Sequence, residues 1–100
     1  AVENLASIIG VPGVDGFLIG PYDLSGSLGV PGQFDHPDMI AAMAEVKRVS
    51  AELHALSGIH VIPPGKEALQ EKIQEGYKFI AASLDILLLG EACRATLVDL

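Results

Sequence analysis

The chain has 100 residues, half of them hydrophobic, and carries a net charge of −7 from 6 basic and 13 acidic residues. The acidic balance argues against a nucleic-acid partner, which needs a basic surface, and the apolar composition excludes a disordered chain. No apolar run is long enough to span a membrane, and the single Cys93 excludes an internal disulfide, so we expect a cytoplasmic protein.

The first third of the chain predicts a helix, a strand and a loop. Residues 3–9 carry apolar side chains at helical spacing, and a Val-Pro-Gly turn ends this helix. The apolar segment 14–20, with the sequence VDGFLIG, predicts a short strand that Gly20 and Pro21 terminate. Repeated Gly and Pro residues then predict a long loop as far as residue 37.

The rest of the chain predicts helices that alternate with strands. A helix is expected over residues 37–56, because apolar side chains recur there every three or four positions. Short apolar strands are expected at 58–62 and 78–84, with a helix at 66–75 between them. A final apolar helix begins at Asp85.

This alternation of helices and strands is typical of parallel β-α-β units in an α/β protein. Three parallel strands buried on both faces cannot close a barrel, and a (β/α)8 (TIM) barrel needs roughly 250 residues. We therefore expect residues 1–100 to form the C-terminal three βα units of such a barrel, as one part of a larger domain. The alternative is an independent three-stranded α/β domain.

The residues Gly20, Pro21, Tyr22 and Asp23 follow the first predicted strand. The C-terminal ends of the strands are where barrel enzymes place their active sites. Glycine allows a ligand to approach the backbone, and proline fixes the direction of the chain. The hard carboxylate oxygens of Asp23 suit Mg²⁺ or Mn²⁺. The alternative is that Asp23 caps the turn that follows it.

The segment GVDGFLIGPYDLSGSLG at 13–29, followed by His-Pro at 36–37, resembles the HpcH/HpaI aldolase/citrate lyase family. The similarity is greatest to its 4-hydroxy-2-oxoheptanedioate and 2-dehydro-3-deoxyglucarate aldolases, and it extends over nearly the whole chain. It implies a class II aldolase that cleaves a 4-hydroxy-2-oxo acid to pyruvate and an aldehyde. It also implies a divalent metal (Mg²⁺, Mn²⁺ or Co²⁺) and a homo-oligomer.

The resemblance also implies a role for each residue of the motif. Asp23 corresponds to one of two carboxylates that bind the metal. Tyr22, beside Gly20 and Pro21, corresponds to the residue whose main-chain N–H helps to hold the pyruvate carboxylate. Family members usually carry Ala or Ser there, so we expect the amide of Tyr22 to act rather than its ring. The second metal carboxylate and the family's catalytic His and Arg are expected before Ala1, so no catalytic residue is expected here and these residues alone should be inactive.

His60 lies within the second predicted strand and should point away from its neighbours Ile59 and Val61. By its position it corresponds to a residue of the family, usually apolar, that contacts the aldehyde. We therefore include His60 among the substrate-binding residues. The alternative is a core histidine with one hydrogen-bond partner.

Other polar residues are expected to be structural. Asp35 and Asp38 flank the start of the long helix and are expected to cap it, while Cys93 is expected in the core. Lys78 lies at the start of a predicted strand, whereas the active site of a barrel lies at the C-terminal ends of its strands. This position disfavours an aldolase that forms a Schiff base through Lys78. Two functional alternatives stay open: a citrate-lyase-like or citrate-synthase-like enzyme on the same fold, and a fragment that serves only in assembly.

Overall fold

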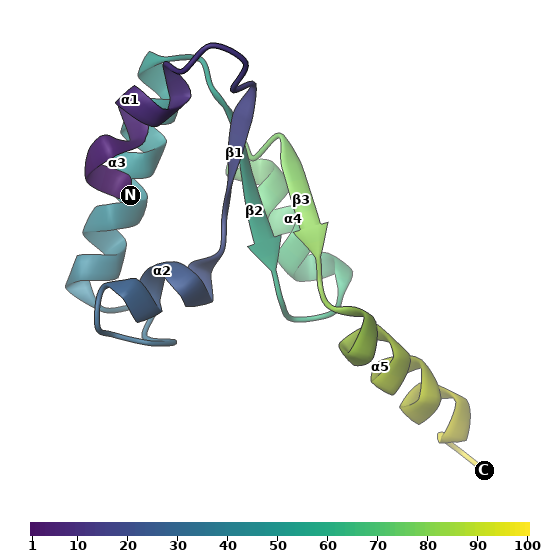
Figure 1. The fold of residues 1–100 in the computed structure, drawn as a ribbon. Coiled ribbons are helices and arrows are strands. Elements are labelled where there is room, and N and C mark those ends of the chain that lie inside the picture. The colour runs from purple at the N-terminus through teal and green to yellow at the C-terminus, as the bar shows by residue number, and fades with distance from the viewer.

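A computed structural model describes residues 1–100 and has a parallel sheet at its centre, with helices α3 and α4 packed beside it (Figure 1). The strands are β1 (Gly16–Ile19), β2 (Leu56–Val61) and β3 (Phe79–Ala82), arranged in the order β1-β2-β3. Both strand pairs are parallel, which confirms the predicted α/β class.

The helices are η1 (Val2–Asn4), α1 (Leu5–Ile9), α2 (Pro21–Ser27), α3 (Pro37–Glu52), α4 (Lys66–Gln74) and α5 (Asp85–Leu97). Their order matches the prediction except at α2, where a loop was expected because of the many Gly and Pro residues. Pro21 is the first residue of α2, a position where its missing N–H costs nothing. The Leu24 N–H donates to the Gly20 carbonyl over 2.9 Å and closes the first turn.

The core lies between the sheet and the helices. Ile19 of β1 pairs with Ile59 of β2, which pairs with Ile80 of β3, so one apolar row crosses the sheet. The buried residues of this core are Leu5, Ile19, Val46, Val49, Ile59, Val61 and Tyr77. Full burial of one such aliphatic side chain contributes about 1.5–3 kcal/mol to the stability of the fold. Because the buried residues lie between the sheet and the helices, this face of the sheet carries most of the stabilising contacts.

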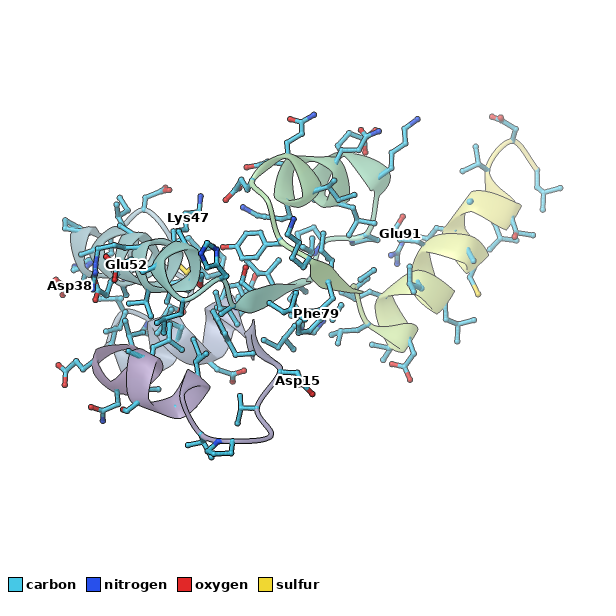
Figure 2. The ribbon with its side chains drawn as sticks, turned by 90° about the horizontal axis from the view of Figure 1, so that it is seen from above. Asp15, Asp38, Lys47, Glu52, Phe79 and Glu91 are labelled. Carbon is cyan, nitrogen blue, oxygen red and sulfur yellow. The ribbon has the colours of Figure 1, made fainter.

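The opposite face of the sheet carries a second row, formed by Leu18, Gly58 and Phe79. Leu18 and Phe79 are 48% and 45% exposed, and Figure 2 shows Phe79 on the side of the sheet away from α4. A Cβ on Gly58 would lie 2.4 Å from the Phe79 ring, so the ring lies directly over this glycine. In a (β/α)8 barrel, the face without helices lines the interior.

Two expectations about helix ends and the core were wrong. The cap of α3 is His36, whose Nδ1 accepts a hydrogen bond from the Asp38 N–H over 3.2 Å, and neither Asp35 nor Asp38 caps it. Cys93 is exposed because α5 extends away from the rest of the chain (Figure 1), where none of its residues is buried. No helix of the structure is long and apolar enough to cross a membrane.

Glu75, just after α4, connects this helix to α3. It accepts hydrogen bonds from Lys47 of α3 over 2.9 Å and from Lys72 over 2.5 Å. Partial burial raises the pKa of Glu75, but the two ammonium groups outweigh burial and hold the pKa below its usual 4.5. A carboxyl group with a lowered pKa in the folded state stabilises the fold above its unfolded-state pKa.

We predict that Glu75→Gln lowers the free energy of unfolding by about 0.5–1 kcal/mol at pH 7, as measured by chemical denaturation. The deficit should shrink as the pH falls below 4.5 and vanish below the folded-state pKa, because Glu75 is then protonated in both states. Glu91→Gln, which removes only an exposed contact with Arg94 on α5, is the matched control and should change little. A deficit of equal size at every pH would contradict the assigned ion pairs.

Candidate functional site

The candidate site lies where the parallel strands end. β1 ends at Ile19 and is followed at once by α2, and Figure 1 shows that all three strands point toward the same edge of the sheet. The C-terminal edge of a parallel sheet is where α/β proteins bind ligands. The motif singled out from the sequence, residues 20–23, forms the end of β1 and the first turn of α2.

Asp23 is the third residue of α2 and is exposed. Its carboxylate folds back over Gly20, where a Cβ would lie 2.5 Å from Oδ2 and 3.4 Å from Cγ. Gly20 is the N-cap residue, and no side-chain hydrogen bond caps α2, so the capping alternative for Asp23 is wrong. The glycine thus leaves room for a carboxylate that faces the strand end.

Tyr22 uses its side chain for packing. Its ring meets Phe34 edge-on, with ring centroids 5.0 Å apart and an interplanar angle of 81°. The N–H groups of Tyr22 and Asp23 lie in the first turn of α2 and have no acceptor within the helix. The amide of Tyr22, at the positive end of the helix dipole, is therefore its group best placed for an anion.

Ser25 anchors α2 and was not identified from the sequence. It is fully buried, and its hydroxyl donates to the Tyr22 carbonyl and accepts from the Gly32 N–H, each over 3.0 Å. Its main-chain carbonyl also accepts from the Val30 N–H over 2.9 Å. Ser27 lies two residues further on in the same polar segment but is exposed, so residue type alone could not separate the two serines.

His60 is half-buried in β2, between two residues of the core. Ile59 and Val61 are 2% and 6% exposed and face the helices, so strand alternation directs His60 to the other face. The His60 Nε2 lies 2.9 Å from the Ser83 carbonyl oxygen, which is the hydrogen-bond partner expected of a core histidine. Ser83 was not singled out from the sequence.

Pro21, Tyr22 and His60 border a cleft of about 370 Å³ that opens between α3 and α4. This cleft lies on the helix side of the sheet, whereas strand alternation directs the His60 ring to the opposite face, so the structure does not bring the ring together with Tyr22 there. Gly20 and Asp23 do not line it. Tyr22 therefore borders the cleft, whereas the Asp23 carboxylate lies over Gly20.

Asp23 has the chemistry of a single metal ligand. Its oxygens are hard donors, and the missing Cβ of Gly20 leaves the carboxylate oxygen beside the strand end. No three His, Cys, Asp or Glu side chains of the chain form a group that could hold a metal ion. Hard divalent cations take about six or more oxygen ligands, so Asp23 fits as one of several donors.

The parallel sheet, the helices beside it and the carboxylate beyond a strand end define an α/β protein of the (β/α)8-barrel kind. Its sequence matches the model of one family over residues 1–92. The chain belongs to the HpcH/HpaI aldolase/citrate lyase family.

Two curated relatives are aldolases. The chain is 42% identical over 87 residues to the hydroxypyruvate/pyruvate aldolase of Roseobacter denitrificans, covering 86% of this chain and 33% of the relative. It is 36% identical over 96 residues to the 4-hydroxy-2-oxo-heptane-1,7-dioate aldolase of Salmonella paratyphi B, covering 95% and 35%. The chain thus spans about a third of the length of these relatives.

Solved structures share the fold. An HpcH/HpaI aldolase/citrate lyase family protein from Burkholderia cenocepacia J2315 superposes with a TM-score of 0.83 at 34% identity, covering 96% of this chain and 37% of that one. The citrate synthase SbnG superposes with a TM-score of 0.74 at 22% identity, covering 96% and 38%. At that identity the second likeness concerns the fold alone.

We predict that Ser25→Ala lowers the free energy of unfolding by about 1–3 kcal/mol, because it removes two hydrogen bonds and leaves the Gly32 N–H without its acceptor. Ser27→Ala is the matched control. The Ser27 hydroxyl donates to the Leu24 carbonyl over 2.9 Å at an exposed position, so its loss should cost less than about 0.5 kcal/mol. Urea denaturation of both variants would measure the difference, and equal effects would contradict the anchoring role of Ser25.

Proposed function

We propose that the whole protein is a metal-dependent aldolase that cleaves a 4-hydroxy-2-oxo acid to pyruvate and an aldehyde. The observation that carries this proposal is the Asp23 carboxylate, which lies over Gly20 at the C-terminal end of β1 and does not cap α2. Membership of a family with aldolase relatives supports the same chemistry.

In this proposal, Asp23 holds Mg²⁺, Mn²⁺ or Co²⁺ together with donors from elsewhere in the whole protein. The bound cation supplies Lewis-acid stabilisation of the negative charge that develops on the 2-oxo acid. The N–H of Tyr22, in the first turn of α2, donates to the substrate carboxylate. Gly20 and Pro21 bring this amide close to the ligand, and His60 contacts the aldehyde half.

The cleavage reaction balances without an oxidant or a covalent intermediate. A base removes the proton of the 4-hydroxyl group, the new C4–O double bond forms and the C3–C4 bond breaks. The electron pair of that bond passes to C3 and C2 and gives the enolate of pyruvate, which takes up a proton at C3. Residues 1–100 bind and orient the substrate, and we assign no base among them.

A second candidate is a citrate-lyase-like or citrate-synthase-like reaction. The family to which the chain belongs is named for citrate lyases as well as aldolases, and one barrel can support many reactions. The two candidates differ in their products, because only the aldolase releases pyruvate from a 4-hydroxy-2-oxo acid.

Self-association of the whole protein remains a prediction. α5 offers an apolar surface, since Ile86, Leu88, Leu89 and Leu97 are each more than half exposed. Packing against a neighbouring subunit and packing within the protein's own barrel would both cover this surface. Size-exclusion chromatography with light scattering on the whole protein should give a mass of two or more subunits, and a monomer would assign α5 to its own barrel.

We predict that Asp23→Asn in the whole protein lowers metal-dependent pyruvate release at least about a hundredfold, because an amide is a weaker ligand for a hard cation than a carboxylate. Pyruvate is measured by coupling to lactate dehydrogenase, with and without EDTA. Asp15→Asn is the matched control, because Asp15 precedes β1 and lies at the other end of that strand. Full activity of Asp23→Asn, or of the wild type in EDTA, would refute the metal role.

Gly20→Ala tests the same carboxylate without altering it. The backbone of Gly20 has φ −96° and ψ 102°, which alanine adopts freely, so the fold should be retained. The new Cβ displaces the Asp23 carboxylate and should weaken Mn²⁺ binding about tenfold or more. Gly26→Ala adds a Cβ that meets nothing within 4 Å and should leave Mn²⁺ affinity unchanged.

A further inference from the structure

A cavity lies at the edge of the sheet opposite the candidate site. β2 and β3 begin at this edge, and α3 and α4 end there (Figure 1). The cavity has a volume of about 430 Å³, within the range of roughly 300–1,000 Å³ that is usual for small-molecule sites. No residue of the motif at 20–23 lines it, so the cavity is separate from the proposed metal and substrate site.

One wall of this cavity contains a buried hydroxyl group without a partner. Tyr77, two residues before β3, lines the cavity and is only 8% exposed. Its hydroxyl is the one buried side-chain nitrogen or oxygen of the structure that has no hydrogen-bond partner, whereas buried polar groups nearly always have one. Burial, and secondarily the negative charge of Glu75, raises the pKa of Tyr77, so the hydroxyl keeps its proton and can donate it to an acceptor.

Basic side chains exceed acidic ones around the cavity. Lys47 of α3 and Lys78 line it, together with the single carboxylate of Glu75. Glu75 already forms ion pairs with Lys47 and with Lys72, so it does not neutralise the ammonium group of Lys78. This local positive excess stands on a chain whose net charge is −7, and it favours an anionic ligand.

The end of α3 does not offer its last carbonyl groups to a cation. The carbonyls of Ser50 and Ala51, two residues of the lining, accept hydrogen bonds from the N–H groups of Ala55 and His54 over 3.0 Å and 3.4 Å. The N–H of Gly76 closes the last turn of α4 in the same way. A ligand therefore meets ammonium and hydroxyl donors at this edge.

The remainder of the lining is largely apolar. Val46, Ala51, Ala55 and Leu56 contribute small or aliphatic side chains to it. Pockets for small molecules usually combine such a lining with a few polar groups that fix the ligand. An anion with a short hydrocarbon chain fits both parts of this cavity, whereas inorganic phosphate is polar on all sides.

We propose that this cavity binds a short-chain monocarboxylate. The carboxylate accepts a hydrogen bond from the Tyr77 hydroxyl and pairs with the Lys78 ammonium group, and the hydrocarbon chain lies against Ala55 and Leu56. Because the cavity and Asp23 lie at opposite edges of the sheet, binding there does not depend on the proposed aldolase function.

The test measures binding of radiolabelled butyrate to the whole protein by equilibrium dialysis. EDTA is present throughout, so that no metal at Asp23 attracts the carboxylate. The wild type should bind butyrate saturably, and inorganic phosphate at the same concentration should not displace it. The absence of saturable binding, or displacement by phosphate, would overturn the proposal.

Tyr77→Phe keeps the ring and should raise the Kd for butyrate about tenfold, because a hydrogen bond to a charged acceptor is lost. Its urea midpoint without butyrate should equal or exceed that of the wild type, since the hydroxyl has no partner within the fold. A hydroxyl with a purely structural role would instead lower the midpoint and leave the Kd unchanged.

Lys78→Met should raise the Kd for butyrate about threefold, because it removes a partly exposed ion pair. Lys66→Met is the matched control, since Lys66 lies at the other end of α4 and outside the lining, and it should leave the Kd unchanged. Butyrate that binds equally well to the wild type, Tyr77→Phe and Lys78→Met would show that it binds elsewhere, which contradicts the assigned site.

Discussion

The parallel pairing of β1 with β2 determines which side chains at the ends of these strands share a face of the sheet. Because Ile19 pairs with Ile59, the residues directly before and after them share the opposite face of the sheet. A slip of β2 by one residue would move Ile59 out of the core and turn His60 into it. The apolar core therefore sets the register of the strands whose ends carry Gly20 and His60.

The turn from β1 into α2 depends on three residues with different functions. Gly20 ends the strand and leaves space for the Asp23 carboxylate, and Pro21 starts the helix without losing a hydrogen bond. Ser25 then fixes the short helix to the loop at Gly32, since a seven-residue helix is too short to be stable by itself. The position of the Asp23 carboxylate thus depends on the buried hydroxyl of Ser25, two residues further along the chain.

The sequence predicted the order of strands and helices because short apolar runs and three-to-four-residue periodicity are local properties. It also placed Asp23 after a strand end. It did not predict α2, because Gly and Pro in residues 20–32 are typical of loops and the helix depends on the contacts of Ser25. Nor could it predict the bond between His60 and Ser83, which joins residues 23 positions apart through a left-handed backbone. Cys93 was misplaced because its apolar helix does not pack on the sheet.

Asp23 lies exposed in the first turn of α2, beside N–H groups that have no acceptor within the helix. The first-turn N–H groups and the aligned peptide dipoles place partial positive charge at this end of the helix. The attraction of such a helix end for an anion is usually about 0.3–1 kcal/mol and is screened by salt. The same N–H groups suit the carboxylate of a 2-oxo acid. In the proposed aldolase, a strand end that leads directly into a helix start thus gives one short segment both a carboxylate for the metal and N–H donors for an anionic substrate.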